Sequence, residues 1–223
     1  IPLEIIYEHR TYLPSMMAIF LLIILFHQGF KNKYIFIACL VSLSLFYSFG
    51  TYNRNKVWQD GLTLWTDCQK KAPNKPRVNQ NFGGELLNAN RTEEAIGALQ
   101  KALYLYTEKV KFQKNVNPRK TSDYLSNLAN AYRANEDYNK AIFYYNKALK
   151  EYYSSARIHY PLGLCYAKIG RLEEAIYHYN EALKLAPYSP YLGVQANVSL
   201  MKNSLNEALR MLKFIKKDQI QNH

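Results

Sequence analysis

Two long apolar runs open the sequence. Residues 13–30 and residues 34–50 contain no aspartate, glutamate, lysine or arginine. A helix needs roughly 17–25 residues to cross the hydrocarbon core of a bilayer. The pattern therefore predicts a transmembrane hairpin, whose two helices are joined by the short connector Lys31-Asn32-Lys33. Core helices of a soluble domain are the alternative, but little else in the chain is apolar enough to surround both runs.

Charges at the ends of the hairpin predict its orientation. The two connector lysines favour the cytoplasmic side under the positive-inside rule. Residues 1–12 would then form an outward-facing juxtamembrane segment, and the chain after residue 50 would also lie on the extracytoplasmic side. Arg10, Arg54 and Lys56 compete with this assignment because they place positive charge at the opposite end.

A helical pattern continues through residues 51–75. Trp58, Leu62 and Trp65 are spaced four and three residues apart, which places them on one face of a helix. We interpret this segment as an amphipathic linker helix at the headgroup level, with Arg54, Trp58 and Trp65 as interfacial anchors. In the alternative interpretation, both tryptophans pack on the helices that follow.

From residue 76 small and aromatic residues recur with a period of about 34 residues. The clearest copy contains Gly163, Tyr166, Ala175, Ala182 and Pro187. Earlier copies contain Ala129, Tyr132, Ala141 and Ala148, and before them Gly83, Ala95 and Ala102. We expect the small residues where two paired helices cross closely, the tyrosines between neighbouring pairs, and the proline at a helix end.

This spacing resembles that of the tetratricopeptide repeat (TPR), a helix pair that stacks into a solenoid. The predicted fold class is therefore all-α, a transmembrane hairpin followed by an α-solenoid. The resemblance covers residues 76–217, with helix pairs at 76–109, 122–155 and 156–188, a degenerate cap at 189–217 and a tail at 218–223. An insertion at about residues 110–121 separates the first two pairs.

Two short boxes beside the apolar runs carry a second resemblance. Glu8, Arg10, Tyr12, Leu13, Pro14 and Ser15 fit E-x-R-x-Y-L-P-S, and Arg54, Trp58 and Asp60 fit R-x-x-x-W-x-D. Together with the repeats, they are similar to the C-terminal part of transmembrane-and-TPR proteins that resemble GT-C-fold protein O-mannosyltransferases. That family's catalytic acid lies in an outward loop outside the present sequence, so the resemblance implies no catalytic residue in this chain and leaves its status as part of an enzyme open.

The same resemblance suggests a role for the first box. Arg10 is a candidate contact for the phosphate of a polyprenyl-phosphate sugar donor, with His9 as a second donor and Glu8 orienting the guanidinium. The alternative is an interfacial anchor, in which Arg10 extends to the lipid headgroups and Pro14 occupies the first helical turn.

The first helices of TPR pairs line a concave surface that holds a partner peptide or helix. The predicted groove residues are Asp123, Ser126, Asn127, Asn130, Arg133, Arg157, Tyr160, Leu164 and Lys168. Asn127 and Arg157 resemble part of the TPR clamp that grips a C-terminal carboxylate. Gln80, Gly84 and Pro161 depart from the clamp pattern, and we therefore expect a generic groove.

Charge and composition indicate which classes of partner and ligand to expect. A net charge of +12 and a pI near 9.4 favour an anionic contact. Nucleic acid is not expected, because TPR tyrosines are buried between helices and offer no stacking surface. The five histidines lack metal-ligand spacing and the three cysteines are too few for a zinc or disulfide framework, so no metal or cofactor is expected. The Ile-Pro start lacks a basic leader, as in an internal fragment.

The sequence thus predicts a membrane-anchored TPR interaction module. Its expected partners are a protein or peptide in the groove, the lipid bilayer and a polyprenyl-phosphate sugar donor. In the main hypothesis, the chain is the C-terminal fragment of a polytopic GT-C-type glycosyltransferase-like protein and presents acceptor polypeptide. A stand-alone membrane-tethered TPR scaffold is the alternative.

Overall fold

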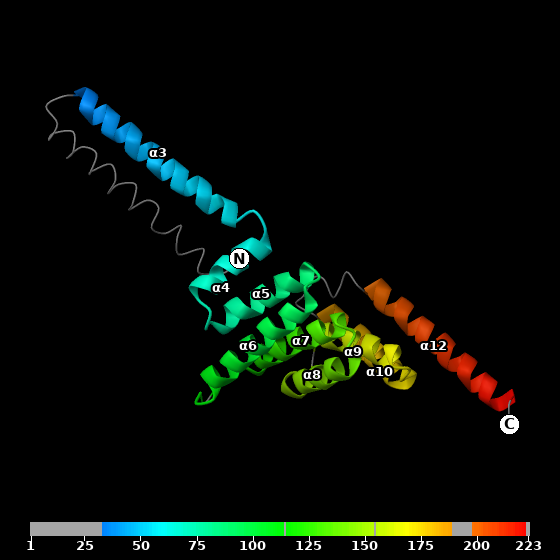
Figure 1. Cartoon of the computed structure of the whole chain (residues 1–223). Coiled ribbons are helices and arrows are strands. Elements are labelled where there is room, and N and C mark those ends of the chain that lie inside the picture. Colours follow the sequence, from blue (N-terminus) through cyan, green and yellow to red (C-terminus); the bar gives the residue numbers. More distant parts are fainter. Residues whose placement is uncertain (1–32, 114, 154, 189–197, 222–223) are drawn as a thin grey trace. The chain divides into compact units, whose positions relative to one another are not determined.

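The computed structural model describes residues 33–113, 115–153, 155–188 and 198–221, and the regular structure in these ranges is helical (Figure 1). The predictions for residues 1–32, which include the first span and the Glu8–Arg10 contact, lie outside the described residues. The chain divides after Gln59 into two compact units, and each unit is described by itself.

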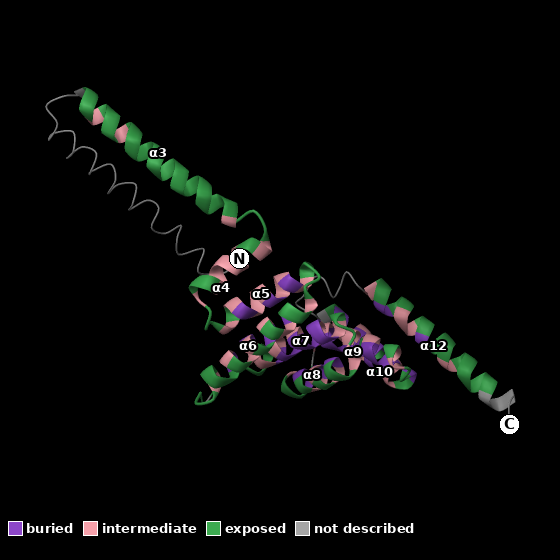
Figure 2. Cartoon of the chain, in the orientation of Figure 1, coloured by how far each residue is buried: buried purple, intermediate pink, exposed green. Residues whose placement is uncertain are grey.

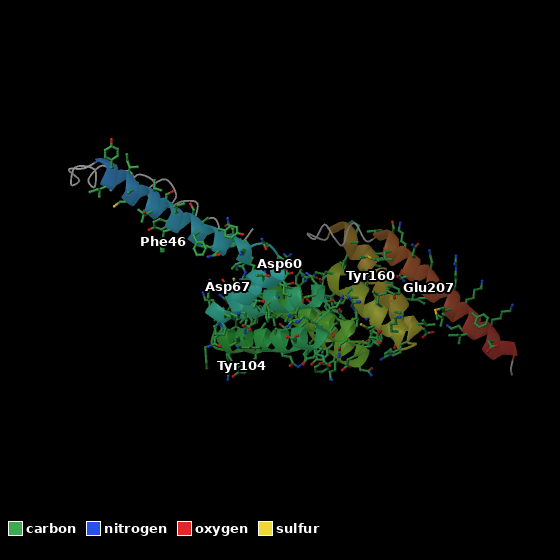
Figure 3. All side chains as sticks on the ribbon, turned by 45° about the horizontal axis from the view of Figure 1, so that its top comes forward. Phe46, Asp60, Asp67, Tyr104, Tyr160 and Glu207 are labelled. Atoms are coloured by element: carbon green, nitrogen blue, oxygen red, sulfur yellow. The ribbon has the colours of Figure 1, made fainter. Side chains whose placement is uncertain are left out.

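The first unit contains a helix that is long and apolar enough to cross a membrane. Helix α3 runs from Lys33 to Val57, and an 18-residue stretch of its segment Tyr34–Val57 has a mean hydropathy of 1.7. Its apolar side chains project outward, and Phe46 is 71% exposed (Figures 2 and 3). The helix continues to Val57, beyond the predicted end at residue 50, and residues 51–57 contain no proline or glycine.

The linker segment contains a helix break instead of the single helix predicted for residues 51–75. Helix α4 spans Gly61–Lys71, and Asp60 is its N-cap, with the extended dihedrals φ −141° and ψ 158°. The Asp60 carboxylate accepts hydrogen bonds from the Thr63 backbone N–H at 2.7 Å and from the Thr63 hydroxyl at 2.6 Å. A capping aspartate leaves the helical backbone conformation. Trp58 and Trp65 therefore do not lie on one continuous helix.

The second unit is built from antiparallel helix pairs that stack as an α-solenoid. Its paired helices are α5 (Pro76–Asn88) with α6 (Thr92–Val110), α7 (Pro118–Ala134) with α8 (Tyr138–Glu151), and α9 (Ala156–Lys168) with α10 (Leu172–Leu185). Neighbouring pairs meet where α6 packs on α7 and where α8 packs on α9. Helix α7 begins four residues before the predicted boundary at 122, because the Asn117 side chain caps it by accepting from the Arg119 backbone N–H at 3.0 Å.

A single helix packs on each end of the stack. Helix α4 packs on α5, and α12 (Val198–Gln221) packs on α10 (Figure 1). Met201 and Ala208 of α12 are buried, at 1% and 3% exposure. The cap was predicted as a degenerate helix pair, but its described part is one continuous helix. Residues 198–221 contain neither proline nor glycine.

Small residues stand where paired helices cross. A Cβ added at Gly163 would lie 2.7 Å from the Tyr179 ring and 3.2 Å from the Ala175 carbonyl oxygen. A Cβ added at Gly83 would lie 2.6 Å from the Leu99 side chain. The small residues Ala95, Ala102, Ala129, Ala141, Ala148, Ala175 and Ala182 are all 0% exposed (Figure 2). Close crossing therefore leaves no room for a larger side chain at these positions.

Tyr132 of α7 and Tyr166 of α9 each link their own pair to the preceding one. The Tyr132 ring stacks on Tyr144, and the Tyr166 ring stacks on His178, each with a 6° angle between planes. The Tyr132 hydroxyl accepts a hydrogen bond from Gln100 of the preceding pair at 2.8 Å. Pro187 lies in the short 3₁₀ helix Ala186–Tyr188 that follows α10.

Candidate peptide-binding groove

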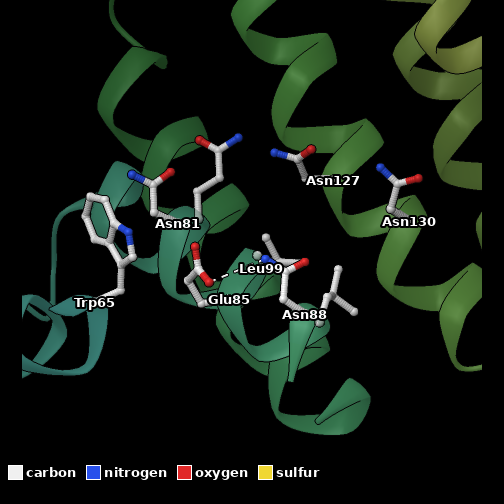
Figure 4. Close-up of a pocket in the computed structure, with 10 residues that line it drawn as sticks. Trp65, Asn81, Glu85, Asn88, Leu99, Asn127 and Asn130 are labelled. Atoms are coloured by element: carbon white, nitrogen blue, oxygen red, sulfur yellow. Dashed lines mark hydrogen bonds between the residues drawn. The ribbon is translucent and has the colours of Figure 1, made fainter. Parts of the chain in front are cut away.

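A pocket of about 490 Å³ opens between α4 and the first helices of two neighbouring pairs, α5 and α7 (Figure 4). Its wall contains Trp65, Gln80, Asn81, Gly84, Glu85, Leu87, Asn88, Leu99, Asn127 and Asn130. We call it the amide pocket because five of these ten side chains are primary amides. First helices line the concave side of a TPR solenoid, so the pocket belongs to that side.

Helical spacing explains why these side chains converge. Gln80, Gly84 and Asn88 recur every four residues along α5, and Asn127 and Asn130 are three residues apart on α7. Residues three and four apart lie on the same face of a helix. The pocket therefore forms where an amide-bearing face of α5 meets an amide-bearing face of α7.

Hydrogen bonds within the stack orient the two asparagines of α7. The Asn127 side-chain oxygen accepts from Nη2 of Arg157 at 2.9 Å, and the Asn130 side-chain oxygen accepts from the Tyr145 hydroxyl. A guanidinium can only donate, so the Asn127 oxygen must face Arg157. Both asparagines then retain amide N–H donors for a bound molecule.

Arg157 joins the second and third pairs beneath the groove. Besides its bond to Asn127, its Nη1 lies 3.4 Å from the Asp123 carboxylate. Both charged side chains are about one-third exposed. The structure thus brings together three of the predicted groove residues, Asp123, Asn127 and Arg157, as one polar cluster.

Other predicted groove residues have packing roles. Ser126 is 2% exposed and its hydroxyl donates to the Asp123 carbonyl within α7, so it does not face a groove. The Tyr160 hydroxyl lies 3.4 Å from Ser204 of α12 (Figure 3). Arg133 lies close to Cys165, where burial raises the thiol pKa to about 12 and the guanidinium acts in the opposite direction.

The remaining predicted site residues lie in different surroundings. Leu164 is half-buried against the core, and Lys168 is exposed in the last turn of α9. Arg54 is exposed on α3, and Trp58 is 47% exposed between α3 and α4. Trp65 is half-buried and forms part of the amide pocket wall. Packing on the repeats, the alternative interpretation, therefore describes Trp65.

Sequence reasoning treated Gln80 and Gly84 of α5 only as departures from the clamp pattern and predicted no groove residue on α5. The second pair begins 12 residues late because of the insertion, and adding those 12 residues to the period of about 34 maps Asn127 onto Asn81 and Ser126 onto Gln80. That corrected register was the available signal. The contribution of Trp65 carried no such signal, because α4 precedes the first repeat.

A buried histidine pair was also missed. The Nδ1 atoms of His159 and His178 are 3.0 Å apart, and the rings are 0% and 8% exposed. Burial lowers the pKa of both imidazoles, and for His178 burial and the neighbouring His159 lower the pKa to about 4. The residues are 19 positions apart in sequence, on α9 and α10. No group of three or more potential metal ligands occurs among the described residues.

Comparison with known proteins agrees with the helix pairing. The tetratricopeptide repeat family model matches residues 126–190. One chain of the Cut9–Hcn1 tetramer of the APC/C is 24% identical over 65% of this chain, with a TM-score of 0.54, and the match spans 25% of that chain. PcrH from Pseudomonas aeruginosa is 15% identical over 60% of this chain and 91% of PcrH, with a TM-score of 0.49. Residues 126–190 therefore match tetratricopeptide repeats, and the fold of the helix stack agrees with this match.

A further similar structure contains a bound peptide. The first TPR of Spaghetti (RPAP3), bound to the HSP90 peptide SRMEEVD, is 20% identical over 59% of this chain and 94% of that chain, with a TM-score of 0.44.

Proposed function

We propose that the TPR array binds an extended polypeptide segment on its concave side, with the amide pocket at the N-terminal end of the binding surface. The observation that carries the proposal is the orientation of Asn127 and Asn130. Their side-chain oxygens accept hydrogen bonds within the array, from Arg157 and Tyr145 respectively, and their N–H groups remain as donors for a ligand. An extended backbone presents unpaired carbonyl acceptors that such donors can bind.

A pocket-filling substitution tests this proposal. Gly84 lines the pocket, and a Cβ added there meets nothing within 4 Å. Gly84→Leu is therefore expected to fill the pocket without strain in the fold, since leucine also has the higher helix propensity. Peptides selected on the full-length chain in detergent micelles from a random library should bind this variant at least about tenfold more weakly, or about 1.4 kcal/mol.

Gly97→Leu is the matched control. Gly97 lies within α6, is exposed and has the same open space at its Cβ, but it does not line the pocket. This variant should bind the selected peptides as the unmodified chain does. Equal binding by the Gly84→Leu variant would exclude the pocket as part of the peptide site.

We further propose that α3 anchors the array in a membrane with the array on the extracytoplasmic side. The length and hydropathy of Tyr34–Val57 support the anchor. Asn90-Arg91-Thr92 matches the glycan acceptor pattern, and Asn90 is exposed in the turn between α5 and α6. On synthesis into microsomes, Asn90 should be glycosylated and an Asn90→Gln variant should not. An unglycosylated membrane-bound chain would indicate the opposite orientation.

The finer proposal is that this array presents acceptor polypeptide as the C-terminal part of a GT-C-type glycosyltransferase-like protein. It is supported by the two short boxes, including the candidate lipid-phosphate contact of Glu8, His9 and Arg10. Reading the gene upstream of Ile1 tests it. Further predicted spans with an acidic pair in the first outward loop would support the proposal, and a start codon directly before Ile1 would leave the stand-alone scaffold.

A further inference from the structure

The amide pocket contains a carboxylate with no cationic partner among the described residues. Within those residues, the Glu85 carboxylate has one hydrogen bond, from the Asn88 side-chain amide at 3.4 Å (Figure 4). Several acidic side chains elsewhere in the stack are paired with a lysine or arginine of their own segment. These pairs are Asp67 with Lys71, Glu94 with Arg91, Asp137 with Lys140, Glu174 with Arg171 and Glu181 with Lys184. Glu85 therefore differs from them in both position and pairing.

The Glu85 carboxylate lies against the first turn of α4. A Cβ added at Gly61 would lie 2.6 Å from the Glu85 Cδ and 2.7 Å from its carboxylate oxygens. The absence of a side chain at Gly61 thus makes room for the carboxylate against the first turn of α4. Trp65 is four residues further along α4 and lies on the same face. The indole and the carboxylate consequently form neighbouring parts of one pocket wall.

An indole beside an unpaired carboxylate is complementary to a cationic side chain. A cation is attracted to the face of a tryptophan ring, and a guanidinium or ammonium group binds a carboxylate by charge-assisted hydrogen bonds. An acidic side chain would be repelled by Glu85. We infer that the pocket takes a lysine or arginine side chain of the bound segment, with Glu85 as its ion-pair partner and Trp65 as the surface over which its cation lies.

This inference rests on the proposed peptide-binding function and adds a specificity to it. The chain as a whole carries a net charge of +12, which on its own favours acidic ligands. A preference for a basic side chain would therefore depend on the local charge of Glu85. Removing that charge should abolish the preference for a basic side chain. The hydrogen bonds from the Asn127 and Asn130 side chains to the backbone of the bound segment should remain.

A positional peptide library tests the inference on the full-length chain in detergent micelles. Peptides selected by the unmodified chain should share a lysine or arginine at one position, and replacing that residue by glutamine should weaken binding at least about tenfold. The Glu85→Gln variant should bind the basic peptide more weakly by a similar factor. It should bind the peptide in which glutamine replaces the basic residue no more weakly than the unmodified chain does. Such non-additivity shows that the two charges contact each other.

Glu151→Gln is the charge-matched control, since Glu151 is exposed at the end of α8 and does not line the pocket. It should leave the preference unchanged. Two results would overturn the inference but keep the proposed function. In the first, the selected peptides bind Gly84→Leu more weakly but share no basic residue. In the second, the preference for a basic residue persists in Glu85→Gln. Failure of the unmodified chain to select any peptide that Gly84→Leu rejects would overturn both.

Discussion

Replacing Ala175 by tryptophan is expected to prevent the third helix pair from folding. Ala175 is 0% exposed at the crossing of α9 and α10, and its carbonyl oxygen already lies 3.2 Å from the place of a Cβ on Gly163. Adding even a methylene to a packed core costs typically about 1–3 kcal/mol. An indole cannot be accommodated without separating the two helices, so the loss should exceed about 4 kcal/mol.

Hydrogen–deuterium exchange of the full-length chain measures this effect pair by pair. Each pair of a solenoid contacts only its neighbours, so protection should be lost in residues 156–185 and largely kept in residues 76–110. Ala134→Trp is the control, because Ala134 is exposed at the end of α7. Unchanged protection of α9 and α10 in Ala175→Trp would contradict the close crossing of these helices.

Acidification from pH 7 to pH 4 is expected to destabilise the stack through the His159–His178 pair. Burial lowers the folded-state pKa of both imidazoles below the ordinary value of 6.5, and that of His178 to about 4. Glu181 and Glu174 oppose the shift of His178 without reversing it. Below pH 6.5 the unfolded chain binds more protons than the folded chain. The contribution of the neutral histidine pair to the free energy of unfolding is therefore present above pH 6.5 and is lost as the pH falls toward 4.

The loss attributable to the pair should be on the order of 2 kcal/mol, discounted from the full linkage value for the partial access of water to the rings. Urea unfolding of the full-length chain at pH 7 and pH 4 measures it. His178→Phe removes the titrating ring but keeps an aromatic partner for Tyr166, so its stability should fall less on acidification. Surface carboxylates away from the pair titrate alike in both chains and cancel in the comparison. An identical pH dependence of the two chains would exclude the pair as the acid-sensitive element.

Local periodicity was sufficient to predict the helix pairs but not their ends. The recurrence of Gly163 and Ala175 identified the crossing of α9 and α10, because only small side chains permit it. The same reasoning placed one helix across residues 51–75, where the Asp60 cap divides the segment. A cap depends on the conformation of a single residue, and hydrophobic spacing does not report it.

The candidate site was only half visible for a similar reason. The concave positions of α7 follow from the repeat register, and Asn127 and Asn130 were predicted on that basis. Trp65 and Glu85 come together because α4 packs on α5 before the first repeat begins. This contact joins segments with no shared period, so no sequence pattern predicts it.

The sequence by itself determined the TPR array and the long apolar segment now seen as α3, because period and hydropathy are properties of neighbouring residues. Tertiary structure alone decided which polar side chains meet. It placed His159 against His178 and left Glu85 beside Trp65 without a cation in the described part of the chain. Such juxtapositions depend on the packing of one helix on another, which fixes distances between residues far apart in the chain.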